Sequence, residues 1–423
     1  MKVLHIGTHA RKGGAGVASY RLVEALRKEG VDARMLVQDG AREGFVETTG
    51  KGRLKALLNL GRFILERLSF WFREGAPELR FLFSPANFGT DISRHPEVRS
   101  ADVLHLHWIN GAFLSLRDLS ALFRSGKPVV WTLHDMWAFT GGCHYALECR
   151  TFEDECGNCL YLKHPSDRDL SHRVWKAKAA FLRDAGLQIV CPSRWLKKEV
   201  RASSLLGKMD SCVIPNPIDK EVFRPMPPEE AWALLGLDRS KKYILFGAAT
   251  VGNMLKGFKW FKEAMALLLN QMEGAEGIEI LVLGKSKEDL QLHFPVKVNQ
   301  MAYTGSEERI VAIYSAAHLF VIPSLADNLP NTIVEAMLCG TPVVGFDSGG
   351  IAEMIPHLSG GYLARRLSAE DLAGGMRYVL EHPEYEQLAA ASRQFALEKY
   401  VDTEPAKQYA ALYARLLNKE EKH

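Results

Sequence analysis

The sequence lacks the features that would place it among membrane-spanning, secreted or repetitive proteins. None of its apolar runs approaches the roughly 20 residues that a helix needs to span a bilayer. Residues 1–7 have neither the long apolar stretch nor the small-residue cleavage site of a signal peptide, and they predict a strand instead. No short-period repeat or low-complexity tract is visible. We therefore expect a cytoplasmic globular protein.

A strong net charge is also missing, because 53 basic and 50 acidic side chains nearly cancel. The two halves differ: residues 1–215 contain 32 Lys and Arg against 23 Asp and Glu, whereas the remainder contains 21 against 27. This basic excess is too diffuse for nucleic-acid binding, and no DNA-binding motif or aromatic-interleaved basic stripe accompanies it. An anionic membrane surface or a phosphate-bearing ligand fits the charge better.

Apolar runs alternate with segments of helical periodicity through the first half of the chain. Continuous apolar strands that alternate with helices form a parallel sheet covered on both faces. The predicted strands are residues 2–8, 31–38, 102–108, 129–134 and 188–191, and the predicted helices are 17–29, 114–123 and a segment that begins near Arg194 after the N-cap Ser193.

Five prolines crowd into residues 215–228 and indicate a linker. The alternation then restarts, with strands at 243–247, 278–284, 319–323 and 343–346 and helices at 258–269, 307–317 and 331–339. We predict two doubly wound α/β domains, 1–215 and 216–400, and a final amphipathic helix, about 401–418, that packs back on the first. Such domains bind ligands at the carboxyl ends of their strands.

The most informative stretch, residues 324–337, follows a predicted strand and opens a helix. Pro330 suits the first helical turn, where its missing N–H would have no partner. The N–H groups of Asn331 and Thr332 would then lie at the positive end of the helix dipole and could bind a diphosphate. Glu335, one turn further on, could accept hydrogen bonds from both hydroxyls of a ribose. An ordinary helix start with an exposed glutamate is the alternative.

This stretch resembles the Glu-x7-Glu signature of the family 4 retaining glycosyltransferases, with Asp327 in place of the first glutamate. The continuation to Gly345, which includes Gly-Thr-Pro-Val-Val, and then Gly349-Gly350-Ile351-Ala352-Glu353 resembles the rest of it. The resemblance covers nearly the whole chain. It implies the GT-B fold, in which two Rossmann-like domains face each other across a cleft and the second binds a nucleotide-sugar donor. Asp327 would contact the transferred sugar, and its shorter side chain could alter donor preference.

The resemblance assigns further residues to the site. Lys256, before Gly257, would contact the diphosphate, although many relatives also have an Arg where Ala248 follows Gly247. Lys259 or Lys285 could supplement its charge.

In the first domain, His134 ends a predicted strand and would approach the donor sugar; a core histidine is the alternative, and His105 and His107 are weaker candidates. A glycine loop, Gly13, Gly14 and Gly16, would line the cleft near the phosphates, or it is a plain turn. Its spacing differs from the Gly-x-Gly-x-x-Gly fingerprint, so we expect no nicotinamide or flavin cofactor.

Four cysteines, Cys143, Cys149, Cys156 and Cys159, are clustered after His134 with the spacing Cys-x5-Cys-x6-Cys-x2-Cys. Four thiols at this spacing can close a tetrahedral structural zinc site. Two disulfides are less compatible with a reducing cytosol. Free thiols remain the other alternative. The zinc would stiffen the loop and take no part in the chemistry.

Residues 51–73 are basic and amphipathic, with Lys51, Arg53, Lys55 and Arg73 among several aromatic and aliphatic side chains. Such a helix can lie at the inner-membrane surface and bring the enzyme to a lipid-linked acceptor. Packing on the first domain with a solvated basic face is the alternative.

We expect a retaining, metal-independent transferase that moves a hexose-type sugar from a nucleoside diphosphate to a glycan or lipid-linked glycan in bacterial surface polysaccharide synthesis. No Asp-x-Asp motif lies near the expected donor site. A non-catalytic sugar-nucleotide-binding subunit and a GT-B-fold nucleotide-sugar isomerase are the two alternatives.

Overall fold

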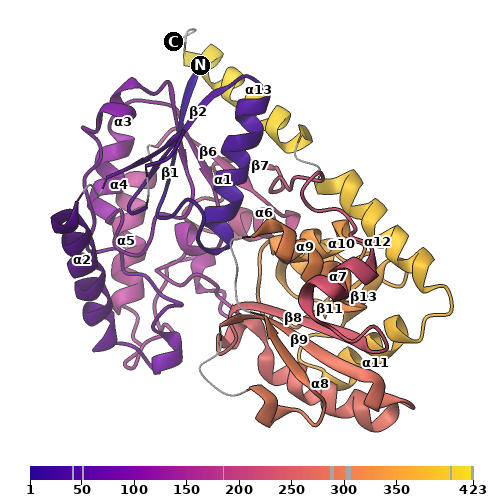
Figure 1. Ribbon diagram of the computed structural model, residues 1–423. Helices are drawn as coiled ribbons and strands as arrows, with labels where there is room; N and C mark the ends of the chain where they lie inside the picture. The colour runs from indigo at the N-terminus through magenta and orange to yellow at the C-terminus, as the bar shows by residue number, and fades with distance from the viewer. Residues whose placement is uncertain are drawn as a thin grey trace. The chain divides into compact units, whose positions relative to one another are not determined.

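A computed structural model describes residues 1–40, 42–49, 52–183, 185–285, 290–301, 306–400 and 403–420. The chain forms two compact units, each with its own parallel sheet (Figure 1). The first unit comprises Met1–Pro217 together with Thr403–His423, and the second comprises Ile218–Asp402.

The sheet of the first unit has seven strands in the order β3-β2-β1-β4-β5-β6-β7. They are β1 (Lys2–Gly7), β2 (Asp32–Val37), β3 (Val46–Thr48), β4 (Val103–Leu106), β5 (Val129–Thr132), β6 (Leu187–Cys191) and β7 (Asp210–Val213). The helices are α1 (Gly13–Lys28), α2 (Arg53–Trp71), α3 (Pro96–Ser100), α4 (Leu116–Phe123), α5 (Leu170–Leu182), α6 (Arg194–Ala202) and α13 (Thr403–Glu420).

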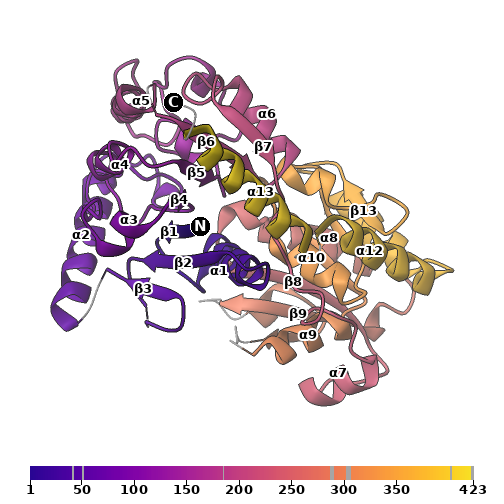
Figure 2. The same ribbon diagram turned by 90° about the horizontal axis from the view of Figure 1, so that it is seen from above.

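The last helix, α13, completes the hydrophobic core of the first unit. It lies beside α1 in both views (Figures 1 and 2), and its Tyr409 and Tyr413 pack in one cluster with Val103 and Val130 of the sheet. A segment more than 180 residues beyond the end of β7 is therefore part of the same core.

Local hydrogen bonds explain two helix starts in the first unit. Ser193 caps α6 by accepting a hydrogen bond from the N–H of Leu196 at 3.0 Å, as the sequence predicts. Ser115 and Asp118 form a reciprocal capping box at the start of α4. That box moves the helix start to Leu116, two residues later than predicted.

The second unit has six strands in the order β10-β9-β8-β11-β12-β13. They are β8 (Lys242–Thr250), β9 (Ile278–Lys285), β10 (Val298–Met301), β11 (Leu319–Ile322), β12 (Val343–Phe346) and β13 (Gly361–Ala364). The helices are α7 (Pro228–Leu235), α8 (Phe258–Gln271), α9 (Glu307–Ala316), α10 (Asn331–Leu338), α11 (Ala369–Leu380) and α12 (Tyr385–Tyr400).

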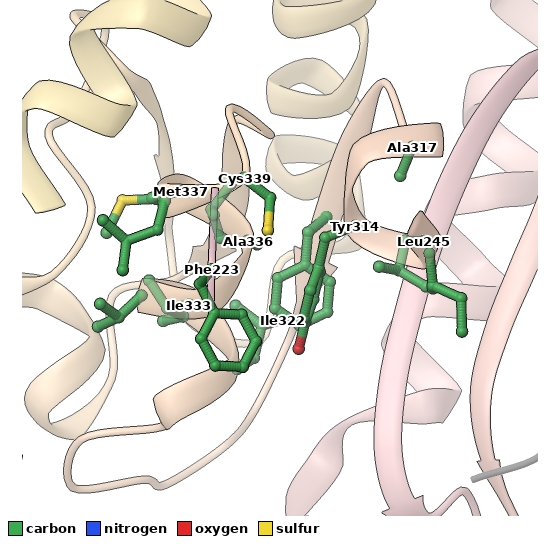
Figure 3. Packing of buried hydrophobic residues seen from close by; sticks show 14 of the residues in the cluster. Phe223, Leu245, Tyr314, Ala317, Ile322, Ile333, Ala336, Met337 and Cys339 are labelled. Atoms are coloured by element: carbon green, nitrogen blue, oxygen red, sulfur yellow. The ribbon is translucent and has the colours of Figure 1, made fainter. Parts of the chain in front are cut away.

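Residues of β8 point alternately into two cores, as expected of a strand covered on both faces. Tyr243 and Leu245 pack in a cluster with residues of α9 and α10, whereas Ile244 and Phe246 pack with α8 and α11. Figure 3 shows the first cluster, in which Phe223 lies with Ile333 and Met337.

Phe223 belongs to the proline-rich segment that the sequence predicts to be a linker. It is buried in the second unit, as is Ile218, and α7 begins at Pro228 within the same stretch. The prolines fix the backbone here without preventing its side chains from joining the core.

Candidate functional site

The loops after β8 and β11 meet at the carboxyl edge of the second sheet. The N–H of Leu325 donates to the carbonyl oxygen of Leu255 at 2.8 Å. Beside this contact, Lys256 Nζ lies 2.6 Å from Asp327 Oδ2, and both side chains are partly accessible. Two residues that separate motifs predict to be in the donor site thus form one ion pair, although they are 71 positions apart in the chain.

Two glycines permit this close approach of the loops. Gly257 has a φ of +71°, and a Cβ there would lie 1.8 Å from the carbonyl oxygen of Pro323. Gly349 has a φ of +57°, and its Cβ would lie 2.2 Å from the carbonyl oxygen of Asp327. That oxygen also accepts a hydrogen bond from the N–H of Gly350 at 2.9 Å. Any larger residue at either glycine would push the loop carrying Asp327 out of place.

The start of α10 borders the same edge. Pro330 is the residue before the helix, with a φ of −65°, rather than its first residue, and its own side chain makes no capping hydrogen bond. The first N–H groups of a helix have no intrahelical acceptor, so the start of α10 concentrates amide hydrogens and the positive end of the dipole. This geometry suits a diphosphate.

Glu335 lies one turn further along α10 and is 8% exposed. Its Oε2 accepts a hydrogen bond from the hydroxyl of Tyr314, on α9, at 3.0 Å. The tyrosine therefore fixes the orientation of the carboxylate, a contact that the sequence did not predict. A carboxylate held in this way is suited to accept hydrogen bonds from vicinal hydroxyls.

The position at which the family resemblance implies an Arg holds Ala248, which is buried within β8. The backbone is crowded there, since a Cβ on Gly284 would lie 1.8 Å from the carbonyl oxygen of Ala248. Lys259, which could supplement the charge, has a largely exposed side chain whose Nζ lies 3.9 Å from Glu263 on its own helix. Lys285 ends β9 and is exposed.

In the first unit, His134 follows β5 at the carboxyl edge of the sheet and is partly exposed. Its Nε2 lies 3.1 Å from Nδ1 of His107. Burial lowers the pKa of His134 to about 4, so its ring is neutral near pH 7. A neutral ring can donate one hydrogen bond and accept another.

The neighbouring residue, Asp135, collects three hydrogen bonds. Its carboxylate accepts from Trp108 Nε1 at 3.0 Å and from the N–H of Trp137 at 2.8 Å, and it lies 2.7 Å from His144 Nδ1. Although burial opposes ionisation, His144, the N–H of Trp137 and His134 together lower the pKa of Asp135. His144 Nε2 in turn lies 3.0 Å from Ser84 Oγ.

The order Ser84, His144, Asp135 matches the arrangement of a serine-hydrolase triad. Ser84 and His144 are buried, however, and the backbone of Ser84 is tied down by the N–H···O bond to Gly142 at 2.8 Å. A buried hydroxyl cannot reach a substrate carbonyl. The network instead fastens the loop around His144 to the end of β5, next to His134.

The glycine segment belongs to the first turn of α1, which therefore starts earlier than the predicted residue 17, although Gly13 keeps a left-handed φ of +70°. Helix α1 begins at Gly13, so Gly13, Gly14 and Gly16 form its first turn, after Lys12 and without a side-chain cap. A Cβ at Gly16 would lie 2.9 Å from the carbonyl oxygen of His9, which explains the glycine there. Gly13 and Gly14 are exposed and a Cβ would meet no such obstacle, but Gly13 has a φ of +70°, which favours glycine.

Comparison with known proteins identifies the family. Residues 12–222 match the model described as Glycosyltransferase Family 4, and residues 241–382 match the model described as Glycosyl transferases group 1. A relative in Escherichia coli K12, named as the colanic acid biosynthesis glycosyl transferase WcaC, is 25% identical over 73% of this chain and 76% of its own.

The chain is a family 4 glycosyltransferase. A second relative, the N,N'-diacetylbacillosaminyl-diphospho-undecaprenol alpha-1,3-N-acetylgalactosaminyltransferase of Campylobacter jejuni, is 28% identical over 44% of this chain and 48% of its own. Among solved structures, Anabaena Alr3699/HepE in complex with UDP-glucose superposes with a TM-score of 0.65 at 17% identity, over 98% of this chain and 100% of that one. The fold is therefore GT-B, and members of this family act with retention of configuration.

The four clustered cysteines of the glycosyltransferase surround one small cavity. Cys143, Cys156 and Cys159 are buried, Cys149 is partly exposed, and all four are free thiols. The cavity is otherwise largely apolar, with Phe83, Phe152 and Tyr161 in its wall. Burial raises the pKa of Cys159 to about 12, and neighbouring thiols add to the rise.

Helix α2 buries mainly polar side chains and exposes apolar ones, which is the reverse of an ordinary surface helix. Its buried residues are mainly polar, namely Asn59, Glu66, Arg67 and Phe70. Its exposed face carries an apolar stripe at helical spacing, which we call the α2 stripe: Leu54, Leu57, Leu58, Ile64, Leu65, Leu68 and Trp71, continued by Phe72. No helix of the described residues is long and apolar enough to cross a bilayer.

Sequence patterns did not predict that His5 and Tyr314 lie beside candidate site residues. His5 lies mid-strand in β1, where a histidine among apolar residues carries no local signal, and it is brought to His107 only by the pairing of β1 with β4. His105 and His107, the weaker candidates, are buried rather than accessible.

Proposed function

We propose that this glycosyltransferase moves a hexose-type sugar from a nucleoside diphosphate to a glycan or lipid-linked glycan in bacterial surface polysaccharide synthesis. The observation that carries the proposal is the Lys256–Asp327 ion pair beside the N-terminus of α10. A cation and a helix N-terminus at one sheet edge suit a diphosphate, and the adjacent carboxylate suits the hydroxyls of its sugar. The polysaccharide context is supported by the name of the Escherichia coli relative.

In this proposal, negative charge develops on the β-phosphate as the sugar departs. Lys256 and the amides of Asn331 and Thr332 stabilise that charge, and such preorganised groups supply a large part of catalysis in many enzymes. Glu335, oriented by Tyr314, binds the ribose hydroxyls. His134 and the first turn of α1, with Gly13, Gly14 and Gly16, contribute from the first unit. The protein's own charges take the place of a divalent ion, as is typical of the family.

The test is turnover of purified protein with a panel of nucleotide sugars, beginning with UDP-glucose, with and without a membrane-lipid extract as the acceptor source. Transfer, or slow release of free sugar and nucleoside diphosphate without acceptor, supports the proposal. Donor binding without turnover, lost in Glu335→Ala, would instead indicate a non-catalytic binding subunit. Conversion of the nucleotide sugar to an isomer without acceptor would indicate an isomerase.

We further propose that the α2 stripe docks on an anionic membrane surface. Exposed apolar side chains of this extent are rare on a monomeric protein and mark an interaction site. Arg53, Lys55 and Arg73 are also exposed at the two ends of this segment, and a basic apolar surface fits the interface of an anionic bilayer. Docking would place the enzyme, in the cytoplasm, next to lipid-linked acceptors.

Finally, we propose that Cys143, Cys149, Cys156 and Cys159 hold a structural zinc ion. Their thiols share one cavity, where Gly141 N–H donates to Cys156 Sγ at 3.1 Å and Cys149 Sγ lies 3.2 Å from Thr151 Oγ1. Thiols kept protonated by burial and by each other become ligands once a cation offsets their charge.

The spacing of the sulfurs sets a condition on this zinc site. Within the described residues, the group of three metal-ligating side chains with donor atoms inside 4.8 Å consists of histidines, so no three of the four sulfurs all lie within that distance of one another. Zn–S bonds of about 2.3 Å require sulfurs about 4 Å apart. Binding therefore requires the cysteine side chains to turn toward the centre of the cavity that they line.

A further inference from the structure

Three histidines form a continuous hydrogen-bonded chain within the first unit. His5 Nδ1 lies 2.9 Å from His107 Nε2, and His107 Nδ1 lies 3.1 Å from His134 Nε2. The rings come from three adjacent strands or their ends, because β1, β4 and β5 are neighbours in the sheet. His5 and His107 are buried, whereas His134 reaches the accessible edge. These hydrogen-bonded histidines thus connect the buried part of the sheet to His134 at its accessible carboxyl edge.

A metal site is the obvious competing explanation, because donor atoms of His5, His105 and His107 lie within 4.8 Å of one another. The ring nitrogens are already engaged, however. Both nitrogens of His107 contact histidines, and both nitrogens of His105 have hydroxyl partners, Tyr413 and Thr132, at 2.7 Å. A metal ion would have to displace these partners, so the hydrogen-bonded arrangement is the better description.

Counting protons shows that the N–H groups of the three histidines have only two possible arrangements. Burial keeps all three rings neutral near pH 7, since it lowers the pKa of His5 to about 3 and that of His134 to about 4, and the pKa of His107 falls in the same direction. A neutral imidazole has one N–H and one lone-pair nitrogen. His107 therefore donates at one end and accepts at the other. The nitrogen of His107 that carries the proton therefore determines which nitrogen is protonated on His5 and on His134.

His5, at the buried end of the three hydrogen-bonded histidines, determines which of the two proton arrangements is adopted. His5 Nε2 is buried, and no group of the described residues forms a hydrogen bond with it. If His134 donated inward, the proton of His5 would lie on this nitrogen as a buried N–H without an acceptor. If His5 donates outward, only a lone pair is left unpaired. Orphaned N–H groups are the rarer defect in protein interiors. The outward direction puts the proton of His134 on Nδ1, for which the described residues offer no partner.

We propose that His5 and His107 are positioning residues that hold His134 as its Nδ1–H tautomer, so that His134 presents a neutral hydrogen-bond donor to an oxygen of the bound nucleotide sugar. The catalytic part of this inference rests on the proposed sugar transfer; the tautomer does not. A donor whose direction is set in advance needs no reorganisation when charge develops in the transition state.

The tautomer can be read directly from the wild-type protein. Protein labelled with 15N in histidine only gives long-range 1H–15N spectra that distinguish Nδ1–H from Nε2–H rings, and His134→Gln assigns the signal. We expect His134 to be Nδ1–H at pH 7.5. An Nε2–H pattern would overturn the proposal, whatever the activity of the enzyme. If the tautomer is as expected but no nucleotide sugar is turned over, the proposed function fails and the tautomer stands.

A matched pair of variants tests the positioning role. His5→Asn keeps an N–H near the position of Nδ1, whereas His5→Leu removes it. We expect His5→Leu to lose the tautomer preference of His134 and to lower kcat about three- to tenfold, the effect of one hydrogen bond, with KM for the donor little changed. His5→Asn should retain both properties. Equal loss of kcat in the two variants, with the His134 tautomer unchanged, would show that His5 acts only through packing and would refute the role.

Discussion

Replacing two leucines of the α2 stripe should weaken membrane binding without unfolding the protein. Leu57 and Leu58 are 64% and 50% exposed, so they contribute little to the core of the first unit. Full burial of a leucine side chain is worth about 1.5–3 kcal/mol, and transfer of the exposed half or more into lipid therefore contributes about 1–2 kcal/mol per residue. Leu57→Gln with Leu58→Gln should reduce partitioning by about 30-fold or more.

The assay is co-sedimentation with sucrose-loaded vesicles of phosphatidylcholine and phosphatidylglycerol in equal parts, compared with phosphatidylcholine alone. Wild-type protein should bind the anionic vesicles, and binding should weaken with added salt as the basic residues are screened. The matched control is Leu234→Gln, an exposed leucine of α7 in the second unit that should change nothing. Equal binding by the double variant and the wild type would refute the reasoning. So would a lipid-independent dimer that the double variant dissociates, because the α2 stripe would then be a protein interface.

Four further predictions concern the site and the stability of its supports. Lys256→Ala should lower kcat/KM about 100-fold, in the range for removal of one preorganised group, whereas Lys259→Ala, a control on an exposed lysine, should have little effect; steady-state kinetics checks both. Cys156→Ser with Cys159→Ser should abolish a zinc content of about one ion per chain, measured by mass spectrometry of the purified protein, while Cys212→Ser should keep it; a wild-type protein without zinc after reduction and zinc loading contradicts that site. Gly257→Ala should destabilise the second unit by more than about 3 kcal/mol in urea unfolding because of its positive φ and the clash with Pro323, whereas Gly252→Ala, which meets nothing within 4 Å, should cost little. Stability should fall as the pH drops below about 6.5, because the unfolded chain binds protons that the buried His5, whose pKa is about 3, does not; the loss by pH 5 is about 2 kcal/mol for this residue, and a flat stability profile from pH 7 to 5 would contradict it.

The periodicity of the sequence was sufficient for most elements of the fold. Strand β12 has the predicted bounds, and α8 begins at Phe258 as predicted, because apolar alternation and helix-start signals act locally. The start of α1 was predicted at residue 17 rather than at Gly13, since glycines are poor helix formers and are typical of turns. Helices α11 and α12 were not predicted at all.

The residues of the candidate site could be predicted from the sequence, but the side chains that hydrogen-bond to them could not. The motif placed Lys256, Asp327 and Glu335 at loop and helix starts, which follows from strand–loop–helix order. Their partners come from elsewhere in the chain: Tyr314 reaches Glu335 from α9, and His5 reaches His134 through His107. Such contacts depend on strand order and helix packing, for which a single sequence contains no local signal.

The inclusion of α13 in the first core determines the order in which the nascent chain can mature. Tyr409 and Tyr413 leave the ribosome only after the whole second unit has been synthesised, so the second unit can acquire its native core while the first still lacks its closing helix. Until then, the side of the sheet that carries His105 has no tyrosine partners. A chain that stops translation a few codons before α13 would retain an intact second unit and expose the apolar face of the first, which makes such truncated products substrates for chaperones and proteases rather than partly active enzymes.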